Sequence, residues 1–155
     1  MFHVDVDSLQ AYLDFDPRRK GDLLKLHALL AKAAPALKRH FHAGTPKGHA
    51  GMRMKMIGYG KFHYMARSVE TVAWPVIGVA LQKNYISVYL AVAKNGVPIL
   101  RDYAGRLGET RSGGNNFSFE AFDDLDAKAL SALFTEVARI FASDADNPVR
   151  YMQGN

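Results

Sequence analysis

Apolar and polar side chains alternate most clearly between residues 74 and 92. In the second half of this stretch one side of the chain carries phenol and hydroxyl groups, and the other side is wholly aliphatic, with Ile86, Val88, Leu90 and Val92. A period of two indicates a half-buried antiparallel strand. The first half, from Trp74 to Leu81, is apolar on both sides, which is typical of a strand near the centre of a sheet. The pattern predicts a central β-hairpin whose arms meet at residues 82–85.

Helical periodicity occurs before and after this hairpin. Asp16 can cap a helix over residues 17–33, which has proline in its first position and an apolar stripe along one side. Because Pro35 would break that helix, we expect a second, shorter helix over residues 35–42. A last amphipathic helix extends to residue 141. Its start is marked by Asp123, Asp124 and Asp126.

Two strands are predicted between the N-terminal helices and the central hairpin. In residues 52–56, three methionines alternate with Arg53 and Lys55, which favours a strand with methionine inward and cations outward. After a pair of glycines, residues 62–67 read as the next strand. Short connections between these strands indicate antiparallel pairing.

Beyond the hairpin, Asn95 and Gly96 mark a turn. A helix is expected over residues 99–107, ended by Gly108. A glycine-rich loop then leads into a strand that contains Phe117 and Phe119.

The order of elements predicts an α+β fold. Two helices, four strands, a helix, a strand and a last helix suggest a two-layer domain, with a curved antiparallel sheet packed by N-terminal and C-terminal helices. We expect one domain over residues 1–155 with its core at about 17–141. Residues 1–14, a tail or an edge strand, and residues 142–155 should be peripheral.

Composition narrows the chemistry that the chain can perform. It has 155 residues and no cysteine, so thiol nucleophiles, thiolate metal sites and disulfides are excluded. The N-terminus lacks a leader pattern, and no apolar run reaches the roughly 18 residues of a membrane span, so we expect a cytoplasmic protein without a membrane partner. The net charge of +5 permits anionic partners, and weak non-specific polyanion binding is expected from it.

A series of short motifs resembles a known family. In order they are AAP at the first helix break, IGYGKFHY before a strand, a W-P-x-I-G hairpin opening, QKNYISVYL, a helix ending in R-L-G, a glycine loop, and F-x-F before D-D-L-D. Over about residues 23–141 this order is similar to the YdhG-like family, a domain of unknown function. The resemblance implies an α+β fold with a curved sheet. One branch of the family is regarded as a frataxin-like intracellular iron chaperone, so the resemblance also implies iron or another divalent metal as cargo.

Histidines are the first candidates for chemistry. His40, His42, His49 and His63 fall within a helix end, a loop and a strand, and neutral imidazoles can hold a divalent metal. Because His40 and His42 diverge on a helix, the candidate metal ligands are His40, His49 and His63. The alternative is that these are surface or hydrogen-bonded histidines.

Cations and aromatic residues are the second set. Arg53 and Lys55 share a strand face, further cations lie at Lys61, Arg67 and Arg111, and Asn116 follows in the glycine-rich loop. Such groups can bind phosphate or carboxylate, or form an ordinary solvated face. Tyrosines and Trp74 beside the cations could line a groove for a flat ligand or for bases, or pack in the ordinary way. The candidate ligand-binding residues are Arg53, Lys55, Tyr59, Tyr64, Trp74 and Tyr89, with Tyr85 close to them.

No catalytic motif is present. The segment GETRSGGNN lacks the spacing and context of a phosphate-binding loop and reads as a turn. The sequence therefore predicts a small binding or carrier-like domain, with metal delivery as the function implied by the resemblance. An anionic-ligand or nucleic-acid binding module and an enzyme of unrecognised class are the alternatives.

Overall fold

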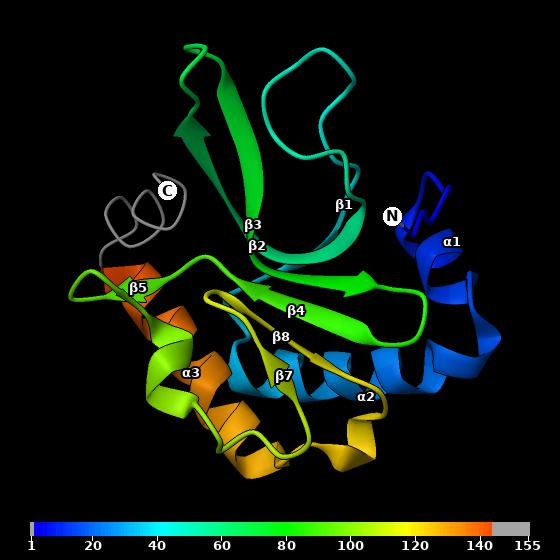
Figure 1. Ribbon diagram of the computed structural model, residues 1–155, viewed down its shortest axis with the longest axis vertical. Helices are drawn as coiled ribbons and strands as arrows, with labels where there is room; N and C mark the ends of the chain where they lie inside the picture. Colours follow the sequence, from blue (N-terminus) through cyan, green and yellow to red (C-terminus); the bar gives the residue numbers. More distant parts are fainter. Residues whose placement is uncertain (1, 144–155) are drawn as a thin grey trace.

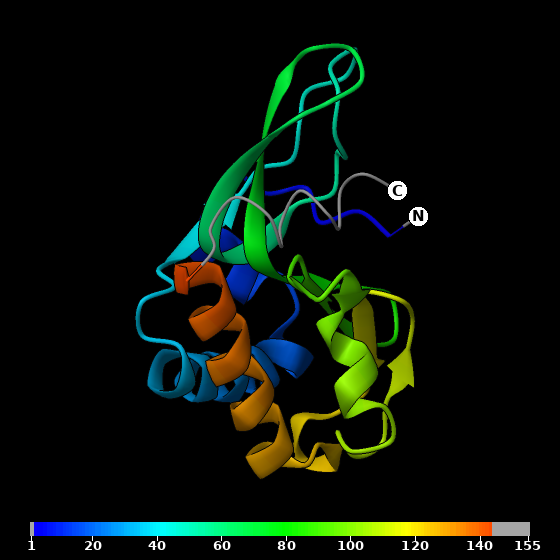
Figure 2. The same cartoon turned by 90° about the vertical axis from the view of Figure 1, so that its left-hand side faces the viewer.

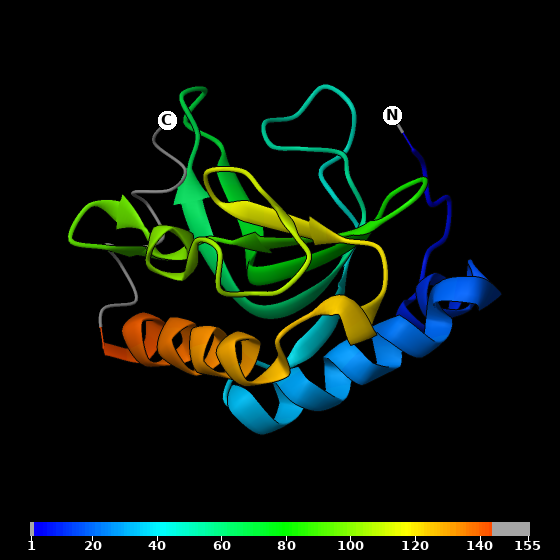
Figure 3. The same ribbon diagram turned by 60° about the horizontal axis from the view of Figure 1, so that its bottom comes forward.

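The computed structural model describes residues 2–143 and shows an α+β fold. A curved, six-stranded antiparallel sheet has the strand order β1-β2-β3-β4-β8-β7, and two long helices, α2 and α3, lie against one of its faces (Figures 1 and 3). In chain order the described elements are α1 (Leu9–Asp14), α2 (Pro17–Ala33), β1 (Arg39–His42), β2 (Met56–Met65), β3 (Thr71–Leu81), β4 (Ile86–Leu90), β5 (Ala93–Lys94), β6 (Val97–Pro98), the 3₁₀ helix η1 (Ile99–Tyr103), β7 (Arg111–Ser112), β8 (Asn116–Phe119), η2 (Phe122–Asp124) and α3 (Ala127–Ser143).

The central hairpin is confirmed. Strands β3 and β4 pair with Val79 opposite Val88, and the backbone N–H of Gln82 donates to the carbonyl of Tyr85 at 2.8 Å to close the turn. Every residue of β3 from position 74 onward is buried, as expected for a central strand. The aliphatic side of β4 is also buried, because it packs in the layer between the sheet and the helices.

A buried arginine joins this hairpin to α2. The Arg19 guanidinium donates through Nη1 to the carbonyl oxygens of Gln82 and Tyr85 and through Nε to the Asp16 carboxylate at 2.8 Å. Asp16 caps α2 by accepting from the backbone N–H of Arg18 at 3.1 Å. The sequence predicted the cap and gave no sign that Arg19 binds the hairpin, because the carbonyls it reaches there are more than 60 residues away.

Replacing Arg19 should therefore weaken the fold. We expect Arg19→Met to lower the free energy of unfolding by about 1.5–3 kcal/mol, since charge-assisted hydrogen bonds to buried carbonyls are lost. Urea unfolding followed by circular dichroism measures this loss. Arg18→Met is the matched control, because the neighbouring side chain is 82% exposed. Equal stability of the two variants would show that the bonds of Arg19 to the hairpin contribute nothing.

The predicted helix over residues 35–42 is wrong. The segment turns after Pro35 and becomes the edge strand β1, in which Arg39 lies opposite Tyr59 and His42 opposite Met56. Proline ends α2 as expected, but so short an apolar pattern does not distinguish helix from strand. Pairing with the otherwise open edge of β2 decides the conformation.

The two strands predicted over residues 52–56 and 62–67 are a single strand, β2, which begins only at Met56. Residues 52–55 have no regular structure, and Met52 is 48% exposed instead of pointing inward. Glycine does not interrupt β2. At Gly58 an added Cβ would lie 2.4 Å from the ring of His40, so this glycine permits the close approach of a neighbouring side chain.

The C-terminal half follows the prediction with changes of detail. The expected helix over residues 99–107 is only the five-residue η1, although Leu107 is buried and Gly108 follows it with a φ of 93°. Helix α3 begins at Ala127, where the Asp126 carboxylate accepts from the backbone N–H of Ala129 at 3.0 Å. Within residues 2–143, no helix is long and apolar enough to cross a membrane. The tail predicted beyond residue 143 lies outside the described residues.

The N-terminal segment contains a helix that the sequence did not indicate. Ser8 caps α1, and Tyr12 of this helix is fully buried. The Tyr12 hydroxyl accepts from the backbone N–H of Leu81 at 2.8 Å and donates to the carbonyl of Lys55, and burial raises its pKa to about 12. Residues 1–14 are thus partly built into the core.

The far ends of β2 and β3 extend beyond the rest of the sheet. Figures 1 and 2 show this hairpin rising away from the helices, with the loop before β2 beside it. We call residues 43–53 and 61–73 the arm. Its two parts are joined by Glu70, whose carboxylate accepts from the backbone N–H of Ala50 at 3.0 Å and lies 3.4 Å from His49.

Candidate functional site

Positive charge is concentrated in one part of the chain. Residues 23–69 contain nine of the 20 lysines and arginines and five of the six histidines, but no aspartate or glutamate. At the average acid content of the chain, a segment of this length would contain about four or five acidic residues. The formal charge of the segment is +9, which leaves −4 for the rest. A net charge of +5 conceals this division.

The fold keeps most of the two charges apart, although Lys25 of α2 pairs with Asp123 of η2 at 3.1 Å. Residues 23–69 form most of α2, the strands β1 and β2, and the loop of the arm, and β1 and β2 lie at one edge of the sheet. Acidic residues gather at the opposite end, around β7, β8 and η2. They are Glu109, Glu120, Asp123, Asp124 and Asp126. The protein therefore has a basic end and an acidic end.

Four exposed cations of the basic end lie on the arm. Lys47, Arg53, Lys61 and Arg67 are all exposed, and none forms an ion pair with the described residues. The one acidic residue of the arm, Glu70, is engaged by Ala50 and His49. Formal charges of +4 and −1 leave the arm with +3, and unpaired, solvated cations of this kind are available to an anionic partner.

Lys55 differs from the other predicted cations. Its Nζ donates to the carbonyl of Val6 at 2.6 Å and lies 3.4 Å from the carboxylate of Asp7. Together with Arg53 it lines a cavity of about 300 Å³ against the N-terminal segment. The N-terminal segment thus neutralises Lys55, while Arg53 has no ion pair with residues 2–143.

The three candidate metal ligands are not brought together. His40 Nε2 is hydrogen-bonded to the carbonyl of Gly60 at 2.9 Å, His49 lies beside Glu70 in the loop, and His63 is exposed on β2. No group of three or more histidine and carboxylate side chains within residues 2–143 is placed to hold a metal ion.

His42 is the buried member of the histidine set. Its ring meets Trp74 edge-on, with the two centroids 5.1 Å apart, and its Nε2 has no hydrogen-bond partner within the described structure. Burial lowers the pKa of His42 to about 4, with smaller contributions from His40 and Lys61. The neutral ring is therefore part of the core.

This depressed pKa makes stability depend on pH. Between about pH 6.5 and pH 4 the unfolded chain binds a proton that the folded chain excludes, so stability should fall as the pH falls through this window, by at most about 3 kcal/mol. Urea unfolding at pH 7 and pH 4.5 measures the change. His42→Phe, which keeps a ring against Trp74 but does not titrate, should flatten the profile. An unchanged profile in that variant would contradict the assignment.

The predicted aromatic groove is not formed. Tyr59 is buried on the helix side, where its hydroxyl is hydrogen-bonded to His27 Nδ1 at 3.0 Å and its pKa is raised by burial to about 12. Trp74 is buried beside His42. Tyr64 packs with Phe62 on the arm, whereas Tyr89 is half-buried on β4. Of the six candidate ligand-binding residues, two belong to the arm. They are Arg53, which is exposed, and Tyr64, which is half-buried.

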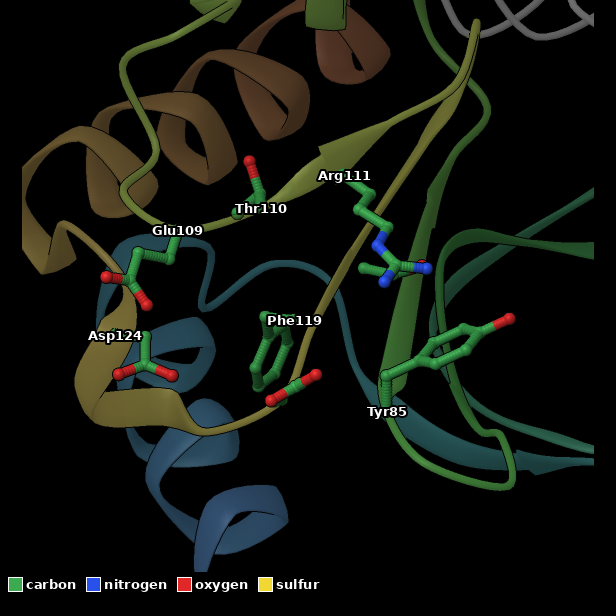
Figure 4. A pocket seen from close by; sticks show the side chains of 8 residues that line it. Tyr85, Glu109, Thr110, Arg111, Phe119 and Asp124 are labelled. Carbon is green, nitrogen blue, oxygen red and sulfur yellow. The ribbon is translucent and has the colours of Figure 1, made fainter.

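A second hollow lies at the acidic end. Residues 109–111 and β8 border a cavity of about 290 Å³, in which Glu109 and Asp124 form one wall, Arg111 and Tyr85 the other, and Phe119 lies between them (Figure 4). Thr110, Ser118 and Glu120 complete the lining. Three carboxylates and one guanidinium give it a charge of −2, so it would attract a small cation and repel phosphate.

Arg111 and Asn116, which the sequence suggested together for anion binding, are placed differently with respect to this cavity. The glycine-rich segment between them is a hairpin turn, as predicted, in which the backbone N–H of Gly113 donates to the carbonyl of Asn116 at 2.7 Å. Asn116 does not line the cavity, and Arg111 lies among carboxylates.

Comparison of the chain with family models, with curated proteins and with solved structures finds no match. The resemblance to the YdhG-like family stays a prediction. The geometry of the described residues is what bears on function.

Proposed function

We propose that this protein binds nucleic acid through the sugar-phosphate backbone, without sequence preference, at its basic end. The observation that carries this proposal is the acid-free segment of nine cations, which includes β1, β2 and much of the arm, and whose four arm cations are exposed and form no ion pair with the described residues. Phosphate contacts from lysine and arginine provide most of the affinity of non-specific nucleic-acid binding.

The spacing of the cations favours a long anion over a small one. A small phosphate or carboxylate is gripped by cations that converge on a cavity, often by a bidentate arginine. The arm cations instead occupy both of its segments, from Lys61 near the base of the hairpin to Arg67 at its tip. A chain of phosphates can contact charges that are distributed in this way, while a single phosphate reaches only one or two.

Metal delivery, the function implied by the family resemblance, receives less support. Among the candidate ligands, His40 and His49 contact different partners and His63 is exposed, and the cations of this end would raise the cost of bringing a divalent cation to it. The same cations favour phosphate. The charge distribution therefore supports nucleic-acid binding over metal binding.

Titration of a fluorescein-labelled DNA 20-mer, single-stranded or duplex, tests the proposal by fluorescence anisotropy. At 50 mM salt we expect binding with a dissociation constant on the order of 10⁻⁶ M for both forms. The affinity should depend little on base sequence. Absence of binding to either form at this salt concentration would overturn the proposal.

A further inference from the structure

The tip of the arm has an unusual backbone. Ala66 and Glu70 close the hairpin, with the N–H of Ala66 donating to the carbonyl of Glu70 at 2.8 Å, and the N–H of Val69 donates to the carbonyl of Ala66 at 2.9 Å. The three-residue loop from Arg67 to Val69 ends with Val69 at a φ of 68°. Three-residue hairpin loops commonly place their last residue in this left-handed region, where glycine is preferred.

Val69 is a poor choice for that conformation. A β-branched side chain at positive φ is a genuine outlier, because its Cβ crowds the backbone. Packing does not account for it, since Val69 is 73% exposed. Backbone strain of this kind is often found where function requires a particular side chain.

A second exposed apolar side chain occurs four residues before Val69 in the same hairpin. Met65, four residues earlier on β2, is 69% exposed, and these are the two most exposed large hydrophobic side chains within residues 2–143. Arg67 lies between them in sequence and is also exposed. The tip thus presents two uncovered apolar groups with a cation between them in sequence. Figure 2 shows the turn of the β2–β3 hairpin at the outer end of the arm.

We propose that Val69 and Met65 form an apolar wedge that contacts the bases of the nucleic acid held by the arm. This inference rests on the proposed function. Proteins that hold nucleic acid by its phosphates often insert aliphatic side chains between base steps, partly unstacking them. The wedge explains why valine occupies a position that favours glycine. Glycine would relax the turn, but it would remove the apolar side chain that contacts the bases.

The charge pattern favours nucleic acid over a lipid surface as the partner. A membrane plane would meet only the tip, whereas the unpaired cations continue along the arm to Lys61 and Arg53. Peripheral membrane contacts also favour exposed aromatic side chains, and the loop from Met65 to Val69 contains none. A phosphate backbone lying along the arm uses both the cations and the tip.

The test compares Val69→Gly and Val69→Thr with the parent protein. Glycine should raise the melting temperature by about 2–4 °C, because it relieves the strain. Threonine keeps the β-branched shape and makes the group polar. Both variants should bind a mismatched DNA duplex about fivefold to tenfold more weakly than the parent and should bind heparin, which has no bases, with unchanged affinity.

A fluorescent base gives a direct readout. In a duplex with 2-aminopurine beside the mismatch, the parent protein should raise the fluorescence as the base unstacks, and the two Val69 variants and Met65→Ser should not. Equal fluorescence changes in parent and variants, or equal losses on DNA and heparin, would overturn the wedge. Binding of the tip to phosphatidylserine vesicles, lost in the variants while DNA binding is kept, would also overturn it. If the parent binds neither DNA nor heparin, the proposed function itself fails.

Discussion

Val88→Asp is expected to prevent stable folding. Val88 is fully buried in the central strand pair, where it lies opposite Val79 on one side and Phe117 on the other. An aspartate at this position would place an unpaired carboxylate, or a protonated acid without hydrogen-bond partners, in the apolar layer between the sheet and the helices. The expected loss exceeds about 4 kcal/mol, which is comparable with the whole stability of a domain of this size.

Circular dichroism during thermal and urea unfolding measures this effect. Asn84→Asp is the matched control, since it places the same charge in the exposed turn of the same hairpin and should change stability by no more than about 0.5 kcal/mol. If Val88→Asp melts within a degree or two of the parent, the strand register is wrong, because a slip of one residue would turn this side chain to the other face.

Removing the arm cations should strongly weaken nucleic-acid binding. We expect the combined substitution of Lys47, Arg53, Lys61 and Arg67 by glutamine to weaken binding of a DNA duplex at 50 mM salt by about a hundredfold or more, because four phosphate contacts are lost. All four side chains are exposed and without ion pairs to the described residues, so the folded structure should be unaffected.

A second variant with the same net charge distinguishes binding at the arm from attraction by the net charge of the protein. Glutamine at Lys83, Arg101, Arg111 and Lys128 also removes two lysines and two arginines, all exposed and outside the basic segment. Its affinity should change by less than about threefold, because charges beyond a Debye length are screened. Equal losses in the two variants would mean that only the net charge attracts DNA, and that the arm is an ordinary solvated surface.

The parts of the fold that the sequence predicted correctly are those where one physical signal dominates. Alternation in β4 identified its buried face, and Asp16 with Pro17 marked the start of α2. The errors lie where a distant partner decides the conformation. Residues 39–42 are a strand because β2 offers an unpaired edge, and Arg19 is buried because the carbonyls of the β3–β4 turn face it.

The candidate site was predicted only in part. Arg53, Lys61 and Arg67 were expected on two adjacent strands, and all three belong to the arm. Lys55 is neutralised by the N-terminal segment, and Tyr59 is buried on the helix side, neither of which local pattern can show. The sequence does contain a signal for the basic end, because residues 23–69 have no aspartate or glutamate. The net charge of the whole chain does not reveal this gap. The conformation of the tip could not be predicted, because the positive φ of Val69 arises only when the hairpin folds.

The salt dependence of DNA binding tests the central claim most directly. For the parent protein and a DNA duplex of mixed sequence, the logarithm of the association constant should fall linearly with the logarithm of salt concentration. Four phosphate contacts by the arm predict a slope of about −3.6, which is a loss of about 150-fold between 50 and 200 mM salt. A slope between zero and −1, or no measurable binding at 50 mM salt, would contradict the account.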